Sequence, residues 1–287
     1  MSTVIVTGSR GLLGATLMRT LPEAGFRAVA LTGDIRDAAA VAKQIAQVAP
    51  AHVLHTAAMT DVAACERQPQ QAFAVNGEGT KNIVAAARAA GGRILYISTA
   101  SVFRGDHGDC READTPEPIN AYNQSKREGE RHTLDYDGGM VLRLNLIGIH
   151  PDGSRGKNFL EWLLDDIGAN KDVTLFADVC INPLSNWTIA ALIAKILTHA
   201  RLDKILHIGS RDAKSKAAIG ELARARFPGY RGTMQAGSVD AIADGVFRPK
   251  QMWLNTDKAT ALLGPMPAVA QELDTIFARS RLLATLG

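Results

Sequence analysis

The stretch Thr7-Gly8-Ser9-Arg10-Gly11-Leu12-Leu13-Gly14 joins an apolar run to an amphipathic segment. The run from Thr3 to Thr7 is typical of a buried strand, and Leu13, Leu17 and Leu21 fall on one face of a helix. Glycines spaced by three and three let the backbone turn tightly and approach a pyrophosphate, which the N–H groups and dipole of the helix N-terminus stabilise. A Walker-type phosphate loop is disfavoured because no Gly-Lys-Ser/Thr follows. The stretch predicts a dinucleotide-binding loop, and a ligand-free glycine turn is the alternative.

The alternation of strand and helix patterns continues through the first half of the chain. Strands are expected over 27–32, 52–57, 93–99 and 140–147, and helices over 38–48, 71–90 and from about 121. This alternation predicts an α/β fold with a doubly wound parallel sheet. Beyond residue 150 the pattern fades to a loop over 151–156, a helix over 159–167 and a strand over 205–209. We expect a dinucleotide-binding domain over 1–150, to which the chain returns around 184–210, and a smaller mixed α/β substrate lobe over 151–287, with the ligand in the cleft between them.

Composition excludes several classes of protein. The 287 residues are 46% hydrophobic and 21% charged, as in globular proteins, and 32 Lys and Arg against 29 Asp and Glu leave a net charge of +3. These charges form no basic block, so no nucleic-acid partner is expected. The three cysteines are far apart, and no export or membrane segment is visible, which favours a reduced, cytoplasmic protein without a membrane partner.

The residues at the end of the second predicted strand bear on the choice between NADP(H) and NAD(H). Where an acidic residue would bind the adenosine ribose, the chain has Leu31-Thr32-Gly33. Asp34 and Ile35 follow, and Asp34 is a candidate for the ribose or adenine contact or for the cap of the next helix. Arg10 is a candidate for a 2′-phosphate contact, since its guanidinium matches phosphate geometry, or a solvated loop cation. These residues favour NADP(H), with NAD(H) as the alternative.

A second group of residues carries candidate catalytic chemistry. Ser98-Thr99 ends a strand, and Tyr122 and Lys126 are four residues apart, so they share a helix face. A single Tyr-x-x-x-Lys usually lies on a solvated helix surface. The catalytic interpretation gains support here because the glycine loop, Asn76 and a strand-end hydroxyl precede the motif in the chain. The seven histidines form no zinc-ligand spacing and no G-x-S-x-G elbow is present, so neither a metal site nor a hydrolase is expected.

Together these motifs resemble the extended short-chain dehydrogenase/reductase family. Its T-G-x-x-G-x-x-G loop, catalytic Ser or Thr and Tyr-x-x-x-Lys all have counterparts here, and Asn76-Gly77-Glu78-Gly79-Thr80-Lys81-Asn82 is similar to its N-V-x-G-T-x-N helix except at Gly77. Within the family the chain is most similar to the dTDP-4-dehydrorhamnose reductases. The stretches that carry this closer likeness are Ala57-Ala58-Met59-Thr60-Asp61-Val62 with Glu66, Ser98-Thr99 with Val102-Phe103, Lys157-Asn158-Phe159, Arg248-Pro249, and Leu254 to Gly264.

The chain departs from those reductases at positions that line or support the sugar site. Ala100 and Ser101 replace an Asp-Tyr pair, Ala63 replaces an Asp, and Leu146 stands where Trp is frequent. These departures affect the identity of the substrate more than the type of reaction. Thr16 replaces a Glu that helps some members to hold magnesium at a dimer contact, so no metal is expected.

The resemblance implies a Rossmann-type reductase of a keto sugar attached to a nucleotide. It implies that Tyr122 donates a proton to the developing alkoxide, that Thr99 hydrogen-bonds the same oxygen, and that Lys126 lowers the pKa of Tyr122 and holds the nicotinamide ribose. The cofactor-binding candidates are Gly8, Ser9, Arg10, Gly11, Leu12, Leu13, Gly14, Thr32, Asp34, Ile35, Ala57, Ala58, Asn76, Tyr122 and Lys126. The substrate-binding candidates are Thr60, Thr99, Asn145, Asn158 and Arg248.

Two other functions are compatible with this resemblance. A sugar-nucleotide epimerase or dehydratase of the same family would reduce and reoxidise its bound cofactor within one turnover. A non-catalytic regulatory subunit, like the β subunit of methionine adenosyltransferase, would bind the cofactor without turnover, although Thr99, Tyr122 and Lys126 are all present. The sequence is compatible with a homodimer but identifies neither the sugar nor the assembly.

Overall fold

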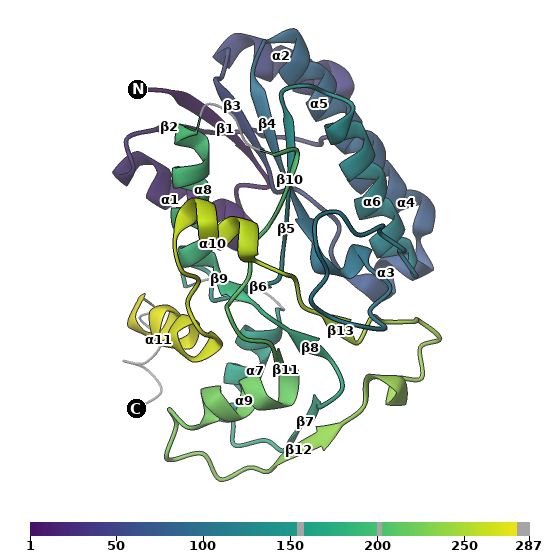
Figure 1. Cartoon of the computed structure of the whole chain (residues 1–287), viewed down its shortest axis with the longest axis vertical. Coiled ribbons are helices and arrows are strands. Elements are labelled where there is room, and N and C mark those ends of the chain that lie inside the picture. Colours follow the sequence, from purple (N-terminus) through teal and green to yellow (C-terminus); the bar gives the residue numbers. More distant parts are fainter. Residues whose placement is uncertain (154–157, 200–202, 280–287) are drawn as a thin grey trace.

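A computed structural model describes residues 1–153, 158–199 and 203–279, and its centre is a six-stranded parallel sheet (Figure 1). Across the sheet the strands are β10 (Ile205–His207), β5 (Gly139–Leu144), β4 (Arg93–Thr99), β3 (His52–His55), β1 (Thr3–Thr7) and β2 (Arg27–Ala30). All five neighbouring pairs are parallel. The predicted doubly wound α/β fold is therefore confirmed. The order reverses beside β1, and ligands of such sheets bind at the carboxyl ends of the strands at this switch point.

Helices cover both faces of the sheet. On one face α1 (Leu12–Glu23) packs against α8 (Asn186–Thr198), and on the other face lie α2 (Ala38–Val48), α5 (Gly79–Ala89) and α6 (Ala121–Leu134) (Figure 1). The predicted stripe of Leu13, Leu17 and Leu21 is buried against Ile189 and Ile193 of α8. Apolar burial of about 25 cal/mol per Å² makes these two faces the main source of stability in this half of the molecule.

The rest of the chain forms a smaller lobe from short elements. These are β6 (Leu146–Ile147) with β9 (Leu184–Ser185), β7 (Val173–Phe176) with β12 (Met234–Gly237), and the sheet of β11 (Lys214–Ser215), β8 (Cys180–Ile181) and β13 (Gln251–Met252). Its helices are α7 (Phe159–Gly168), α9 (Lys216–Arg224) and α11 (Val269–Arg279), and α10 (Asp257–Leu263) packs near β10. A second apolar core, including Leu160, Leu163, Ile219 and Leu273, holds this lobe together.

Two predicted elements are interrupted. The expected helix over 71–90 begins as α4 (Pro69–Phe73), widens into a π-helical turn over Ala74–Glu78 and continues as α5. The expected strand over 140–147 splits into β5 and β6 at Asn145, whose side chain donates a hydrogen bond to the carbonyl of Met252 at 2.6 Å. The second interruption coincides with a tertiary contact, because Asn145 binds a carbonyl outside the segment.

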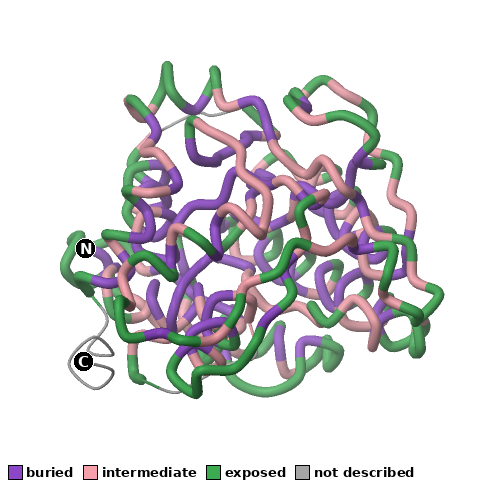
Figure 2. Tube along the Cα trace, turned by 90° about the horizontal axis from the view of Figure 1, so that it is seen from below, coloured by how far each residue is buried: buried purple, intermediate pink, exposed green. Residues whose placement is uncertain are grey.

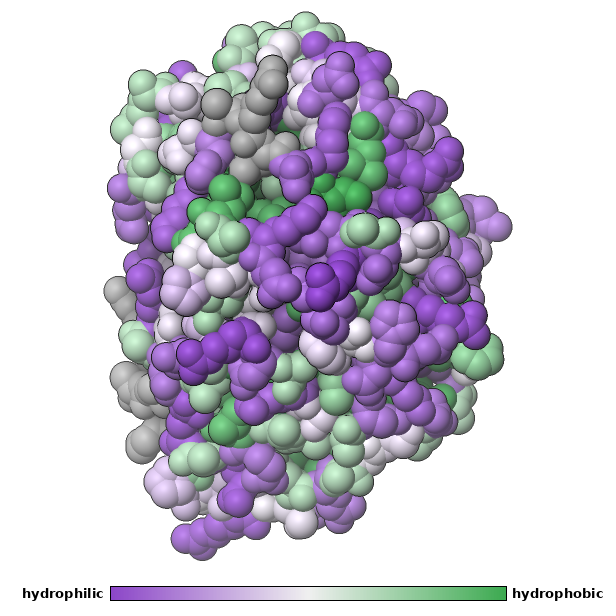
Figure 3. Space-filling view, in the orientation of Figure 1, coloured by the Kyte–Doolittle hydropathy of each residue, from purple (hydrophilic) through white to green (hydrophobic). Residues whose placement is uncertain are grey.

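Burial follows this two-part design. Figure 2 shows buried segments through the middle of the molecule and exposed segments around its edge. On the face seen in Figure 3, apolar residues gather in small patches between hydrophilic ones. Within the described residues, no helix is long and apolar enough to cross a lipid bilayer.

Candidate active site

The glycine loop after β1 is shaped for close approach to a ligand. Gly8 has a φ of +62°, and a Cβ there would lie 2.7 Å from the backbone nitrogen of Ala57. A Cβ at Gly14 would overlap the carbonyl oxygen of Gly8. Gly11 precedes α1 and no side chain caps this helix end, so its N–H groups face outward as a ready site for a phosphate.

A chain of buried hydrogen bonds supports this loop from below. The Thr80 hydroxyl donates to the carbonyl of Asn76 at 2.6 Å, so its oxygen accepts from His55 Nε2 at 3.0 Å. His55 Nδ1 then accepts from the Thr7 hydroxyl at 2.7 Å, and Thr7 Oγ1 accepts from the backbone N–H groups of Thr56 and Ala57. Burial, and secondarily the charge of Lys126, lowers the pKa of His55 to about 3, which keeps this ring neutral. The chain fixes the end of β1 against the end of β3.

A cavity of about 680 Å³ lies in front of the loop. Seven of the predicted cofactor residues line it: Gly11, Leu12, Leu13, Gly14, Ala58, Tyr122 and Lys126. Gly8, Ser9 and Arg10 form the start of the same loop, and Ala57 packs against Gly8. The sequence motif and the cavity therefore coincide.

The residues that follow β2 contact neighbouring residues and do not line the larger cavity. Gln44 accepts hydrogen bonds from the backbone N–H and hydroxyl of Thr32. Arg36 pairs with Asp34 at 2.5 to 3.0 Å and lowers the pKa of that carboxyl to about 2. Ile35 is buried. Arg36, which the sequence interpretation did not consider, therefore neutralises the one acidic candidate for ribose binding.

Asn76 is placed differently from the expectation of direct cofactor contact. Its side chain is 1% exposed, accepts from the N–H of Met59 at 2.8 Å, and donates to the carbonyl of Met59 and to Ser125 Oγ. The π-helical turn presents Asn76 to these partners. Asn76 thus ties the segment after β3 to α6, because its amide is fully used within the protein.

Thr99, Tyr122 and Lys126 meet at the wall of the cavity, as the sequence predicts. Thr99 ends β4, and Tyr122 and Lys126 occupy one face of α6, one turn apart. Asn120 caps α6 by accepting from the N–H of Asn123, and Glu66 accepts from the N–H of Ala121 at 2.8 Å. These contacts fix the first turn of α6, where Tyr122 lies.

The electrostatics of this group differ from the expectation. Burial raises the pKa of Tyr122 to about 12, although hydrogen bonding with Thr99 acts in the opposite direction. Burial lowers the pKa of Lys126 to about 7, and its ammonium donates to the carbonyl of Ile97 at 2.8 Å, 4.1 Å from the centre of the Tyr96 ring. The expectation that Lys126 lowers the pKa of Tyr122 is therefore wrong for this arrangement, because burial dominates and Lys126 is directed at Ile97 and Tyr96.

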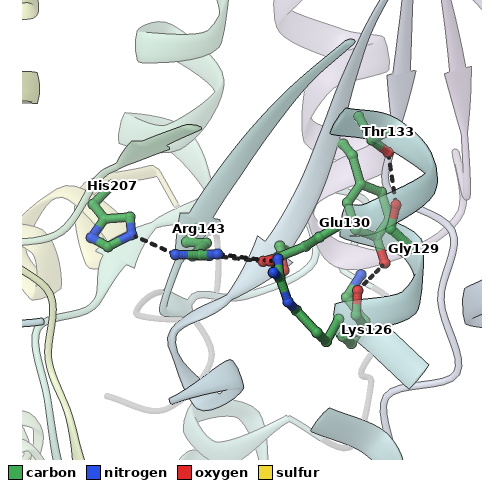
Figure 4. Close-up of polar contacts among 9 residues, drawn as sticks. Lys126, Gly129, Glu130, Thr133, Arg143 and His207 are labelled. Atoms are coloured by element: carbon green, nitrogen blue, oxygen red, sulfur yellow. Dashed lines mark hydrogen bonds and ion pairs between the residues drawn. The ribbon is translucent and has the colours of Figure 1, made fainter. Parts of the chain in front are cut away.

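A buried ion pair lies one turn further along α6. Glu130 accepts from Arg143 of β5 through both carboxylate oxygens at 2.8 Å and from Ser98 at 2.6 Å. Figure 4 shows Arg143 between Glu130 and His207. Because Arg143 can only donate, His207 Nε2 accepts from it and Nδ1 donates to the carbonyl of Cys110. The pair, with Ser98, joins α6, β4 and β5 next to the group of Thr99, Tyr122 and Lys126.

A smaller cavity of about 380 Å³ opens from the same place. Thr60, Thr99, Tyr122, Asn145 and Leu146 line both cavities. Of the predicted substrate residues, Arg248 lines the smaller cavity, Asn158 lines the larger one, and Thr60, Thr99 and Asn145 line both. Lys157 falls outside the described residues.

The smaller cavity also contains Asn123 and Lys216, which the sequence interpretation missed. Asn123 lies inside the Tyr-x-x-x-Lys motif, which was a usable signal, whereas Lys216 has no motif around it. Among the described residues, no group of three or more His, Cys, Asp or Glu side chains is arranged to hold a metal ion.

Comparison with known proteins agrees with this geometry. The model of the RmlD substrate binding domain matches residues 1–281. The chain belongs to this family. It is 31% identical to the probable low-salt glycan biosynthesis reductase Agl14 of Haloferax volcanii over 75% of this chain and 77% of that protein. It is 37% identical to a dTDP-4-dehydrorhamnose reductase of Streptomyces griseus over 61% of this chain and 58% of that protein.

The fold of this RmlD family member also matches solved structures. The crystal structure of dTDP-4-dehydrorhamnose reductase from Bacillus anthracis in complex with NADP superposes with a TM-score of 0.89, covering 97% of this chain and 99% of that one at 24% identity. This likeness concerns the fold. The resemblance to the extended dehydrogenase/reductases inferred from the motifs is confirmed by the family match.

Proposed function

We propose that this protein is an NADP(H)-dependent reductase of a keto sugar nucleotide. The observation that carries the proposal is the meeting of two cavities at Thr99 and Tyr122, one of them lined by the glycine loop and Lys126. Two substrates that react with each other need two sites that share one wall at the reacting atoms. The names of the related proteins, a glycan biosynthesis reductase and a dTDP-4-dehydrorhamnose reductase, support the same reaction class.

The larger cavity fits a dinucleotide. Gly8 and Gly14 leave room that a Cβ would fill, and the uncapped start of α1 offers N–H groups to the pyrophosphate. The nicotinamide end would lie near Lys126, and the adenosine end near Arg10 and the residues after β2. NADP(H) is the preferred cofactor because Arg36 pairs with Asp34, the first carboxylate after β2. NAD(H) is the weaker alternative.

When bound, the cofactor supplies a hydride to the carbonyl carbon of the substrate. Tyr122 donates its phenolic proton to the oxygen that becomes the alkoxide, and a pKa of about 12 keeps that proton on Tyr122 at neutral pH. The hydroxyl of Thr99 donates a hydrogen bond to the same oxygen and holds it in place. Lys126 lies on the same face of α6, one turn from Tyr122, and would hold the nicotinamide ribose.

The two parts of the chain divide this work. Residues 1–150 supply most of the wall of the dinucleotide cavity. The wall of the substrate cavity is shared almost equally between residues 1–150 and the later part of the chain, which contributes Arg248. Thr60, Asn145 and Asn158 complete the substrate-binding set. A homodimer and a cytoplasmic location stay predictions.

The test is turnover of keto sugar nucleotides, followed by the absorbance of NADPH. We expect wild-type protein to oxidise NADPH stoichiometrically with one such substrate. Tyr122→Phe should bind NADPH normally but lose ~10²- to 10⁴-fold in kcat, because only the proton donor is removed. Tyr136→Phe is the matched control, since the Tyr136 hydroxyl donates to the carbonyl of Gly92, away from both cavities.

Each alternative function gives a different result. Conversion of a sugar nucleotide without net NADPH oxidation would indicate an epimerase or dehydratase. Cofactor binding without turnover of any carbonyl substrate would favour the regulatory function. Wild-type turnover in Tyr122→Phe would contradict the assigned mechanism.

A further inference from the structure

The smaller cavity has an unusual charge. In the part of the chain that the structure describes, its wall contains two cationic side chains, Lys216 and Arg248, and no acidic one. Arg248 is paired with Asp244 at 2.5 and 2.9 Å. Lys216 has no acidic partner among the described residues, so the excess positive charge of this cavity comes from its ammonium group.

Lys216 occupies a position that disfavours a cation in three ways. It is the first residue of α9, where the helix dipole favours negative charge. Burial lowers its pKa, and the nearby charge of Arg248 lowers that pKa further. Its ammonium lies 5.5 Å from the centre of the Phe159 ring and 5.8 Å from that of Phe176, and these aromatic faces are the main favourable contacts for the charge. Proteins keep such locally unfavourable choices mostly at functional sites.

Asn123, in the wall of the same cavity, is a second polar group without a partner in the described part of the chain. Its side chain is 1% exposed, and neither Nδ2 nor Oδ1 has a hydrogen-bond partner among the described residues. A buried amide without partners costs roughly 1 to 3 kcal/mol. Asn123 lines the smaller cavity and follows Tyr122 directly in α6, so its free donor and acceptor are beside the proton donor.

From these two groups we infer the orientation of the substrate: Lys216 binds the diphosphate of the sugar nucleotide, and Asn123 binds the sugar hydroxyls next to the reacting carbonyl. The inference rests on the proposed function and assigns the parts of its substrate. An ammonium held by aromatic rings recognises a phosphate as a point charge, and an amide with both groups free can donate to one hydroxyl and accept from another. The sugar therefore lies against Tyr122, and the nucleotide extends towards the lobe that carries α9 and Arg248.

Calorimetry with unreactive probes tests the orientation directly. The probes are UDP and dTDP, which carry only the diphosphate end, and UDP-glucose and dTDP-glucose, which carry the sugar as well; all titrations contain saturating NADPH. Lys216→Met should weaken all four by ~10- to 100-fold, the size of a hydrogen bond to a charged group. Asn123→Ala should weaken only the two sugar-bearing probes, by ~5- to 10-fold.

Lys214→Met is the matched control for charge, because Lys214 lies two residues away, is paired with Asp212 at 3.1 Å and does not line the cavity. It should leave all four affinities unchanged. Thermal unfolding shows whether each variant is folded, and Asn123→Ala should unfold at or above the wild-type temperature because the lost amide has no partner. NADPH binding of the variants should equal that of the wild type.

Failure of the orientation and failure of the proposed function give different results. If the wild type binds none of the four probes at millimolar concentration, the proposed substrate class is wrong and the orientation with it. If the wild type binds but Lys216→Met behaves like Lys214→Met, the diphosphate assignment is overturned while the reductase remains. An equal loss of bare and sugar-bearing probes in Asn123→Ala would overturn the sugar assignment.

Discussion

In the proposed function, the two cavities that meet at Tyr122 would bind phosphate in different ways. In the larger one the binding groups belong to the backbone. Gly8 and Gly14 leave space that a Cβ would fill, and the uncapped start of α1 supplies N–H groups. In the smaller one the groups are side chains: Lys216 begins α9, and Arg248 lies in the segment before β13. A phosphate site made of backbone N–H groups needs closely spaced glycines, which are visible as a motif in the sequence. A site made of side chains that are distant in sequence is assembled only by folding, so it has no such motif.

The supports behind the two cavities differ in the same way. Behind the larger cavity a charged pair, Glu130 and Arg143, connects α6 to β5. Beside the smaller one a neutral amide connects separate segments. Asn182 donates to the carbonyls of Ser210 and Leu254 and accepts from the N–H of Leu254. A buried charge depends on its partner far more strongly than a buried amide does.

The largest expected effect breaks the charged support. Arg143→Leu removes the fully buried cation beside Glu130 and leaves Ser98 and Arg127 as the hydrogen-bond partners of this carboxylate among the described residues. We expect this change to lower the free energy of unfolding by ~3 to 5 kcal/mol. Urea denaturation measures this change. Asn182→Ala should cost less, ~1 to 3 kcal/mol, because only neutral groups lose partners.

A double variant separates charge from packing. Arg143→Leu combined with Glu130→Leu removes both charges and should recover a large part of the stability lost in Arg143→Leu alone. The contrast between the two supports would be wrong if Arg143→Leu cost no more than Asn182→Ala, or if the double variant were less stable than the single one.

The next effect compares the buried Lys126 with the half-buried Lys216 through the pH dependence of stability. The pKa of Lys126 is about 7 in the folded protein and about 10 when unfolded, so between these values the unfolded chain binds one more proton and stability rises with pH. From pH 7 to 9 the Lys126 contribution is at most about 3 kcal/mol, at ~1.4 kcal/mol per unit. Lys126→Met removes it.

We therefore expect the stability of Lys126→Met relative to the wild type to be greater at pH 6 than at pH 9. Thermal unfolding of both proteins at each pH measures this difference. Lys216→Met should show the same sign, because burial and Arg248 also lower the pKa of Lys216. A difference from the wild type that is equal at pH 6 and pH 9 would contradict the buried, partly neutral state assigned to Lys126.

The sequence allowed the glycine loop and the Thr99, Tyr122 and Lys126 group of the larger cavity to be predicted, but less of the smaller cavity. Periodic apolar residues predict the alternating elements, and the loop from Thr7 to Gly14 carries its own chemistry. Thr99, Tyr122 and Lys126 could be grouped because Tyr122 and Lys126 are one helical turn apart and Thr99 ends a strand. Lys216 is separated from Tyr122 by 94 residues, and nothing local distinguishes it from a surface lysine.

The wrong or incomplete predictions share a physical cause. Asn76 carries a family motif, yet its amide is consumed by Met59 and Ser125, contacts that depend on a π-helical turn. The predicted strand over 140–147 breaks because Asn145 binds a carbonyl over a hundred residues away. The direction of the Tyr122 pKa depends on burial and on where Lys126 points. In each case tertiary contacts overrule a local pattern.

The smallest expected effect concerns the outer end of the larger cavity, where backbone recognition gives way to side chains. Arg10 is exposed in the glycine loop, and we expect Arg10→Ala to weaken NADPH binding about 10-fold at low salt while NADH binding stays unchanged, because only NADPH carries the 2′-phosphate. The difference should shrink as salt rises, since an exposed ion pair is screened. Fluorescence titration of both cofactors measures it, with Arg36→Ala as the competing variant. Arg36 follows β2 and is paired with Asp34, so a selective NADPH loss in Arg36→Ala but not in Arg10→Ala would move the phosphate contact from the loop to the end of β2. Equal wild-type affinity for NADPH and NADH would refute the cofactor preference itself.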